Sequence, residues 1–314
     1  MRGKNATERI APDEAGIASA CAILADGGLV AVPTETVYGL AARADSAEAV
    51  ARIYAAKGRP SFNPLIVHVA DAEHAARLTR FDPRARLLAE QFWPGPLTLV
   101  LPRSEGAELA EAVTAGLETL AIRVPAHPVM QQILHASGLP LAAPSANRSE
   151  AISPTTPDHV LETLDDRIDA VIDAGPSERG VESTIVALRD SGGWGMLRLG
   201  PIDRDEITSL LGPEEAKSGD RIEGPGQLGR HYAPGKPMRL NVLKAEPDEF
   251  LIGYGPVAGD ISLSPTGDVN EAASRLYACL HTAARAGHPR IAVAPVPLAG
   301  VGAALNDRLR RAAS

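Results

Sequence analysis

Two polar clusters early in the sequence follow apolar runs, at points where α/β enzymes commonly place functional side chains. The first, residues 33–40 (PTETVYGL), brings hydroxyls and a carboxylate directly after an apolar run, a pattern that a capped turn also produces. The second contains Lys57, Arg59, Asn63 and His68. A lysine and an arginine two residues apart suit a phosphate, although they could equally complement the dipole at a helix C-terminus. A single histidine within an apolar strand is commonly a satisfied core residue.

Two further polar clusters lie in the middle of the chain. In the third, Ser145 follows the apolar run 141–143, and Ser153 comes shortly after. Small residues and hydroxyls after a strand let a ligand approach the backbone, but an ordinary Asx or Ser turn has the same composition. The fourth, residues 180–186 (GVESTIV), contains Ser183 and could also be the start of a strand with exposed hydroxyls.

Two arginines interrupt runs that are otherwise apolar. Arg123 lies in residues 120–124, and Arg198 lies in residues 196–199. A guanidinium in a buried strand needs an anionic partner, because burying it unpaired is costly. A ligand carboxylate or phosphate would serve, and so would a carboxylate of the protein.

The common nucleotide and hydrolase signatures are absent from the sequence. It contains no G-x-x-x-x-G-K-[ST], no G-x-G-x-x-G after a strand, no H-E-x-x-H and no G-x-S-x-G. A phosphate site must therefore use Lys, Arg, Ser and backbone amides from several loops. Cys21 and Cys279 are the only cysteines and lie far apart, so we expect two buried free thiols in a reducing compartment and no tightly bound metal.

The composition is that of a soluble globular protein, and the length suggests about two domains. The chain has 314 residues, of which 45% are hydrophobic and 22% charged. The net charge of −8 argues against a surface built for tight nonspecific nucleic-acid binding, although a local basic patch could still contact RNA weakly. Residues 1–12 lack an apolar signal core, and no run of about 18 apolar residues occurs, so we expect a cytoplasmic protein without a membrane anchor.

The apolar periods predict an α/β fold in which the polar clusters end the strands. The expected helices cover residues 13–26, 46–56 (with Ser46 as N-cap), 83–92 and 270–286. The expected strands cover residues 29–33, 65–69, 97–101, 120–124, 141–143, 170–173, 183–188, 196–199, 250–253 and 291–294. Residues 212–237 are rich in Gly, Pro and charge without an apolar period, which is typical of a linker. We therefore predict a catalytic domain over 13–211, a linker over 212–237 and a small α/β domain over 238–314.

Each cluster is weak evidence alone, but their order and spacing resemble the threonylcarbamoyl-AMP synthase family, whose members contain a YrdC-like domain. The matching segments are PTETVYGL, KGRPSFNPLIVHV, WPGPLTLVL, TLAIRVPAHP, PLAAPSANRS with SPT, GVESTIV with LRLGP, GPGQLGRHYAP and VGAALNDRLRRA. The last two resemble the linker and C-terminal domain of the longer, two-domain members. The resemblance implies a YrdC-like twisted mixed sheet with helices, and a smaller Rossmann-like C-terminal domain. The chain departs from the family in carrying Glu150 where Gly is usual, and in a shorter C-terminal domain.

Carried over position by position, the resemblance implies two adjoining subsites. Threonine would be held by Thr36, His68, Arg123 (facing its carboxylate), Ala143 (through its backbone) and Ser183. ATP would be held by Arg59, Asn63, Thr119, Ser145, Ser153 and Arg198. Lys57 would face the phosphates or the carbonate-derived group and, with Arg59, act in catalysis. Tyr232, in the HYAP segment of the linker, would close over the nucleotide.

The resemblance also implies the reaction. Threonine and bicarbonate would give a carbamate, which attacks the α-phosphorus of ATP and releases pyrophosphate. Mg²⁺ would be bound mainly by the triphosphate. Separate transferase proteins would then place the threonylcarbamoyl group on tRNA adenosine. Such chemistry needs close positioning of reactants, cations near the phosphates and a site that closes against water, for which the linker could act as a lid.

Three other functions remain open at this point. A related enzyme could form a carbamoyl-adenylate on another substrate, and threonine-dependent pyrophosphate release would separate the two. An RNA-binding module without catalysis would show steeply salt-dependent RNA binding and no ATP turnover. A small-molecule sensor would be distinguished only by assay.

Overall fold

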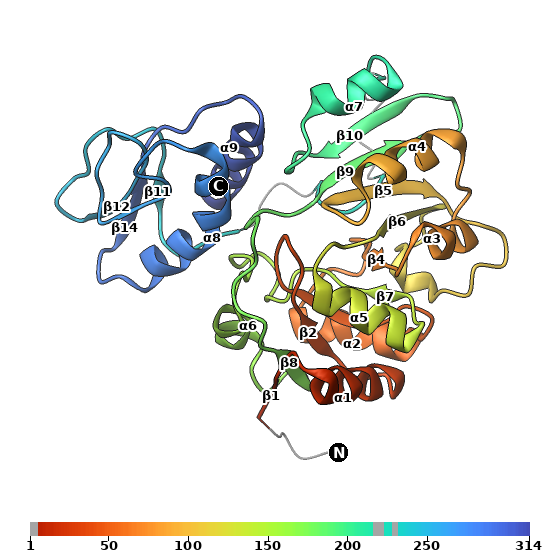
Figure 1. Cartoon of the computed structure of the whole chain (residues 1–314). Helices are drawn as coiled ribbons and strands as arrows, with labels where there is room; N and C mark the ends of the chain where they lie inside the picture. The colour runs from red at the N-terminus through yellow and green to blue at the C-terminus, as the bar shows by residue number, and fades with distance from the viewer. Residues whose placement is uncertain (1–5, 216–222, 228–231) are drawn as a thin grey trace.

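The protein folds into two lobes, each centred on one β-sheet (Figure 1). The structure is a computed structural model, which describes residues 6–215, 223–227 and 232–314. The large lobe contains a ten-stranded mixed sheet, and the small lobe contains a four-stranded parallel sheet. The predicted α/β class is therefore confirmed. The predicted linker limits, 212–237, stay a prediction, and residues 216–222 and 228–231 lie outside the described part.

The sheet of the large lobe has the strand order β1-β8-β2-β3-β7-β4-β6-β5-β9-β10. Its strands are β1 Glu8–Ile10, β2 Val30–Val32, β3 Gly39–Arg43, β4 Ile66–His68, β5 Leu97–Pro102, β6 Thr119–Arg123, β7 Leu141–Ala142, β8 Ala170–Ile172, β9 Thr184–Leu188 and β10 Trp194–Arg198. Its α-helices are α1 Glu14–Ala25, α2 Ala47–Lys57, α3 Ala72–Leu78, α4 Pro83–Phe92, α5 Pro128–Ser137, α6 Pro157–Leu164 and α7 Arg204–Leu211. A short 3-10 helix covers Glu111–Val113.

Local side-chain chemistry explains where the predicted helices begin and end. The carboxylate of Asp13 and the hydroxyl of Ser46 accept backbone N–H groups at the starts of α1 and α2, as N-cap residues do. Helix α2 ends at Gly58, whose φ of 61° is a left-handed conformation that glycine adopts without strain. The four predicted helices are all present, each within one residue of its predicted ends.

The elements that were not predicted are mostly short or overlap the motif segments. Strand β3 lies partly within the PTETVYGL motif and is built from Gly, Leu and Ala, which carry little strand signal. Several helices were also missed, among them α5, which begins inside the TLAIRVPAHP segment. The other elements not predicted are β1, α3, α6, α7, β11, β13 and α9.

Alternation along the strands divides the large sheet into two different faces. Leu65 and Val67 point into the main core, which the helices α2, α4 and α7 complete. Ile66, between them, points to the opposite face, with Val100, Ala121, Ile185 and Ala187. Helices α1 and α5 cover another part of that opposite face, near β2. Around Ile66 the cover includes a linker segment instead, because Gly224 lies against Val100 and Leu197.

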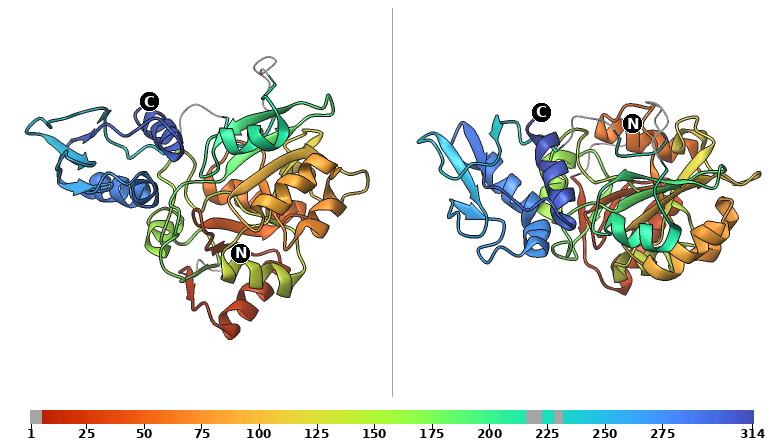
Figure 2. Two further views of the ribbon diagram at one scale, coloured as in Figure 1. Left: turned by 45° about the horizontal axis from the view of Figure 1, so that its top comes forward. Right: turned by 90° about the horizontal axis from the view of Figure 1, so that it is seen from above.

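The small lobe places its two helices against the large lobe. Its strands are β11 Met238–Arg239, β12 Glu249–Gly253, β13 Ile261–Ser262 and β14 Arg290–Val293, in the order β11-β14-β12-β13. Helices α8 Val269–Arg285 and α9 Val301–Ala312 lie between this sheet and the large lobe (Figures 1 and 2). Val37 and Val181 of the large lobe share a buried apolar cluster with Tyr277 of α8, so the lobes are joined by a core. Within the described part of the chain, no helix is long and apolar enough to cross a membrane.

Candidate active site

A cavity of about 70 Å³ lies on the face of the large sheet that is turned towards the linker and α9. Its walls are the loop after β2, the loop between α2 and β4, the ends of β4, β6 and β10, and the loops after β7 and before β9. Pro225, Gly226 and Tyr232 of the linker and Arg311 of α9 complete the lining. Most of the residues predicted for the two subsites meet here: Thr36, Arg59, Asn63, His68, Arg123, Ala143, Ser145, Ser183, Arg198 and Tyr232.

Strand register places the residues predicted for threonine side by side. β4 and β6 are parallel, and their register pairs His68 directly with Arg123. Both side chains share the sheet face of Ile66 and Ala121, because residues two apart along a strand point the same way. β5 and β9 are also parallel, and Thr98 Oγ1 lies 2.7 Å from Ser183 Oγ.

Arg123 is held in place by groups of the protein itself. Its Nη2 donates to Glu35 Oε1 at 2.6 Å, its Nη1 to Thr36 Oγ1 at 3.0 Å, and its Nε to the carbonyl of Gly95 at 3.1 Å. Glu35 is therefore the protein carboxylate that the sequence left open as one possible partner of Arg123. A guanidinium has five N–H donors, so two remain that could meet a ligand carboxylate. Burial would raise the pKa of Glu35, but Arg123 outweighs it and lowers the pKa below its ordinary value.

His68 is a neutral, buried imidazole at the cavity wall. Burial, with the adjacent charge of Arg123, lowers its pKa from 6.5 to about 3. Its Nδ1 is buried without a hydrogen-bond partner among the described residues. A buried nitrogen of this kind costs free energy unless a ligand or water meets it, which favours the threonine-binding prediction for His68. The backbone N–H of Ala143 donates to Ile66 at 3.0 Å, which leaves its carbonyl as the backbone group that could meet a ligand.

Arg59 and Arg198 give the other half of the cavity an excess of positive charge. Arg59 donates to the carbonyls of Asn63 and Pro64 and also interacts with the hydroxyl of Tyr54, and Arg198 donates to the carbonyl and hydroxyl of Ser183. Of the residues that the structure describes, none places a carboxylate within 4.0 Å of either guanidinium. Burial lowers the pKa of each to about 10, and the charge of Arg198 adds to the effect on Arg59, so both stay cationic at neutral pH. Two cations that form no ion pair with a described carboxylate suit an anionic ligand.

Lys57 is not among the residues that line this cavity, and its predicted place beside the phosphates or the carbonate-derived group stays a prediction. Its side chain is buried, and its Nζ donates to the carbonyls of Ser145 and Asn147, each at 2.5 Å. Burial and the charge of Arg59 lower its pKa well below the ordinary value. Lys57 therefore holds the loop after β7, which carries Ser145 into the cavity. The spacing of Lys57 and Arg59 in the sequence does not reveal that Lys57, the last residue of α2, turns towards this loop.

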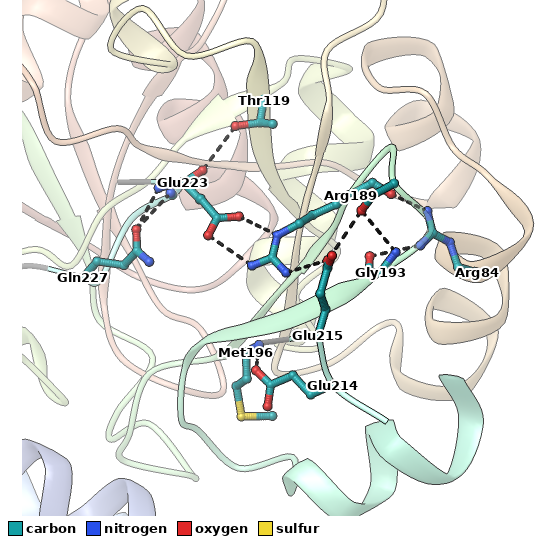
Figure 3. A network of polar contacts seen from close by, with 11 residues as sticks. Arg84, Thr119, Arg189, Gly193, Met196, Glu214, Glu215, Glu223 and Gln227 are labelled. Carbon is teal, nitrogen blue, oxygen red and sulfur yellow. Dashed lines mark hydrogen bonds and ion pairs between the residues drawn. The ribbon is translucent and has the colours of Figure 1, made fainter. Parts of the chain in front are cut away.

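Thr119 is also outside the cavity, on the part of the sheet nearer the linker. Its Oγ1 donates to the carbonyl of Glu223 at 3.2 Å, as Figure 3 shows. The carboxylate of Glu223 accepts from Arg189, which also donates to Glu215. This network fastens linker residue 223 to β6 and to the residues after β9. In this conformation Thr119 meets the linker rather than the space beside Arg59.

Ser153 does not line the cavity either. It contacts Glu182, which pairs with Arg308, and neither of these two residues was assigned a role from the sequence. Its Oγ donates to Glu182 Oε1 at 2.6 Å. Glu182, named only as part of the GVESTIV motif, lines the cavity and pairs with Arg308 of α9 at 2.8 Å. A signal for Arg308 was present, because it follows Leu305 by three residues and adjoins Leu309, which places it on the apolar face of a helix.

Comparison with known protein families matches almost the whole chain. The family model Sua5_yciO_yrdC, described as "Telomere recombination", matches residues 22–200. The model described as "Threonylcarbamoyl-AMP synthase, C-terminal domain" matches residues 202–314.

Individual relatives and solved structures agree with these matches. The chain is 45% identical to the threonylcarbamoyl-AMP synthase of Bacillus subtilis, over 78% of this chain and 72% of that protein. It is 38% identical to the threonylcarbamoyl-AMP synthase of Pyrococcus abyssi, over 98% and 96% of the two chains. The crystal structure of P. abyssi Sua5 complexed with L-threonine superposes with a TM-score of 0.88, at 36% identity over 98% of this chain and 97% of that one. This chain belongs to the threonylcarbamoyl-AMP synthase family.

Proposed function

We propose that this protein is an L-threonylcarbamoyladenylate synthase, which converts L-threonine, bicarbonate and ATP into threonylcarbamoyl-AMP and pyrophosphate. Family membership supports the reaction. The structural observation that carries the proposal is that Arg59 and Arg198, neither of which forms an ion pair with a carboxylate of the described residues, lie in the same cavity as the predicted threonine residues around Arg123. An amino acid and a nucleoside triphosphate would therefore meet in one space.

The two halves of the cavity have distinct roles in this proposal. Arg123 uses its two remaining donors for the threonine carboxylate, and His68 accepts from a threonine donor through Nδ1. The threonine nitrogen attacks carbon dioxide derived from bicarbonate and loses a proton, giving a carbamate. A carbamate oxygen then attacks the α-phosphorus, and the bond from that phosphorus to the bridging oxygen of pyrophosphate breaks. Arg59 and Arg198 stabilise the negative charge that gathers on the phosphates.

ATP arrives in this proposal as its Mg²⁺ complex, with the metal held mainly by the triphosphate. Asn63 and Ser145 contribute polar groups beside Arg59. Lys57 acts indirectly, because it fixes the loop that carries Ser145. Ser153 and Thr119 remain candidates for ATP contact only in a conformation where their present partners, Glu182 and Glu223, give way.

The small volume of the cavity is consistent with a linker that is closed over it in this structure. Pockets that bind small ligands usually measure about 300–1,000 Å³, whereas this one measures about 70 Å³. Pro225, Gly226 and Tyr232 form part of its wall, so an outward shift of these residues would admit ATP, and their return would exclude water from the labile intermediates. The product would pass to separate tRNA threonylcarbamoyl transferase proteins in the cytoplasm.

The test is an omission series with purified protein. ATP, Mg²⁺, bicarbonate and threonine are each left out in turn, while pyrophosphate and the adenylate product are followed. We expect full turnover only with all four present, and loss of turnover in Arg59→Ala. Pyrophosphate release that does not depend on threonine would refute the proposal and favour a related enzyme with another substrate. Salt-sensitive RNA binding without ATP turnover would favour an RNA-binding module.

A further inference from the structure

Glu182 is a buried carboxylate that lines the cavity and lies at the contact between the two lobes. It is 6% exposed, and its Oε1 accepts hydrogen bonds from Ser153 at 2.6 Å and from the hydroxyl of Tyr277 at 2.9 Å. Its Oε2 accepts from Arg308 Nε at 2.8 Å. Tyr277 and Arg308 belong to the helices α8 and α9 of the small lobe. The small lobe therefore supplies the counter-ion of a large-lobe residue that lines the cavity.

Arg308 touches three parts of the cavity wall at once. It is fully buried, and its Nη2 donates to the carbonyl of Leu199 at 2.8 Å, beside the end of β10. Its guanidinium lies 5.5 Å from the centre of the Tyr232 ring, a cation–π distance. With its bond to Glu182, one side chain links the strand end that carries Arg198, the linker tyrosine and the loop that carries Ser183.

Glu182 can also attract Arg198. Arg198 donates to both the carbonyl and the hydroxyl of Ser183, the residue next to Glu182. Burial would raise the pKa of Glu182. The charges of Arg308 and then of Arg198 outweigh burial and lower this pKa to about 2, so Glu182 attracts both arginines. In the structure only Arg308 forms an ion pair with it, because no carboxylate of the described residues lies within 4.0 Å of Arg198.

We propose that Arg308 is a positioning residue for the nucleotide: by neutralising Glu182, it keeps the guanidinium of Arg198 available to the phosphates of ATP. The inference deepens the proposed function, because it rests on Arg198 meeting ATP. Without Arg308, a buried carboxylate would lose its counter-ion, and the adjacent Arg198 is the cation best placed to replace it. Arg198 would then turn from the ligand towards Glu182. The small lobe is on this view a working part of the active site.

A double-mutant cycle tests this exchange of partners. ATP affinity is measured by calorimetry with Mg²⁺ and without threonine or bicarbonate, for wild type, Arg308→Gln, Glu182→Gln and the double variant. We expect Arg308→Gln to weaken ATP binding on the order of tenfold, because contacting charges are strongly coupled. The double variant should regain most of that loss, since the carboxylate that would capture Arg198 is gone. Arg310→Gln, an exposed neighbour on α9, is the matched control and should bind like wild type.

The outcomes distinguish a positioning role of Arg308 from a role in packing alone. A double variant that binds ATP no better than Arg308→Gln would overturn the proposal, and so would wild-type affinity in Arg308→Gln. If Arg308→Gln does not fold, Arg308→Lys replaces it. Lysine keeps the charge beside Glu182 but loses the fork that also reaches Leu199, so wild-type ATP affinity supports the proposal, and a tenfold loss in a folded protein refutes it. Because the cycle reads ATP binding alone, failure of threonine-dependent turnover in wild type would remove the proposed reaction without altering this result.

Discussion

Glu35 Oε1 lies 2.6 Å from Arg123 Nη2, and the two side chains are only 5% and 4% exposed. The pair joins residues from different elements, the loop after β2 and the end of β6. It fixes the guanidinium in the cavity wall and leaves two N–H donors without a partner among residues 6–215, 223–227 and 232–314, so little reorganisation is needed when a carboxylate binds. An ion pair buried to this degree is costly to break from one side, because the remaining charge has no water to solvate it.

Glu35→Ala is therefore expected to lower the free energy of unfolding by about 3–5 kcal/mol. Urea denaturation measures the change. Asp190→Ala is the control, because Asp190 pairs with Arg80 on the surface, where both side chains are more than 60% exposed. That substitution should cost less than about 1 kcal/mol. Equal effects of the two substitutions would mean that the Glu35 pair is not the buried contact described here.

Lys57 and Arg59 should respond differently to substitution, although they stand two residues apart. Lys57→Met leaves buried carbonyls without a donor and should cost about 1–3 kcal/mol of folding stability, along with activity. Arg59→Ala should reduce turnover by roughly 10²–10³-fold, with a smaller loss of stability. Urea denaturation and pyrophosphate release are measured on both variants. A Lys57→Met protein as stable as wild type but inactive would favour the phosphate role that the sequence predicts for Lys57.

Glu182 should make part of the folding stability depend on pH. Its pKa is about 2 in the folded protein, against 4.5 for an ordinary glutamate, so its stabilisation is complete above about pH 4.5 and is lost as the pH falls towards 2. The full effect is on the order of 3 kcal/mol. Unfolding free energies of wild type and Glu182→Gln, measured from pH 6 downwards, should converge as the pH falls. A gap that stays constant with pH would count against the ion pair with Arg308.

His68 should affect threonine more than ATP, because it pairs in register with Arg123, the proposed partner of the threonine carboxylate. Loss of one hydrogen bond to the substrate in His68→Ala should raise the KM for threonine about tenfold and change the KM for ATP much less. Steady-state pyrophosphate release at varied threonine and at varied ATP provides both values. His135→Ala, an exposed histidine on α5, is the control. A larger effect on ATP would place His68 in the other subsite.

Glu150 occupies a backbone position that favours glycine. Its φ is 69°, in the left-handed region, and its carbonyl accepts from the N–H of Ala233 in the linker at 2.8 Å. Glu150→Gly should raise the free energy of unfolding by about 0.5–1 kcal/mol, because the relief of strain exceeds the entropy that glycine adds to the unfolded chain. Glu150→Ala keeps the Cβ and should give no such gain. Thermal unfolding of the two variants decides, and equal midpoints would contradict the strain argument.

Much of the local structure follows from the sequence alone. Ser46 was expected to cap α2 and does, and the residues predicted for α4 coincide with the observed helix Pro83–Phe92. Apolar periods and capping residues act over a few residues, so they can be read without knowing the rest of the fold. The polar motifs likewise stand at the ends of apolar runs in the sequence, and the cavity gathers most of them.

The ion pairs could not be predicted from the sequence in the same way. Glu35 and Arg123 are 88 residues apart, and Glu182 and Arg308 are 126 apart. The residues next to each of them in the sequence do not indicate its partner, because the pairing depends on strand register and on how α9 packs against the large lobe. Lys57 shows the same limit, since its distance in sequence from Arg59 said nothing of the loop it binds.

The sequence by itself thus determined the kind of chemistry available, its approximate positions along the chain and the family that carries it. The tertiary structure alone decided which cations are neutralised and which remain for a ligand. The physical reason is that the cost of burying a charge depends on every group around it, and those groups are brought together only when distant segments pack.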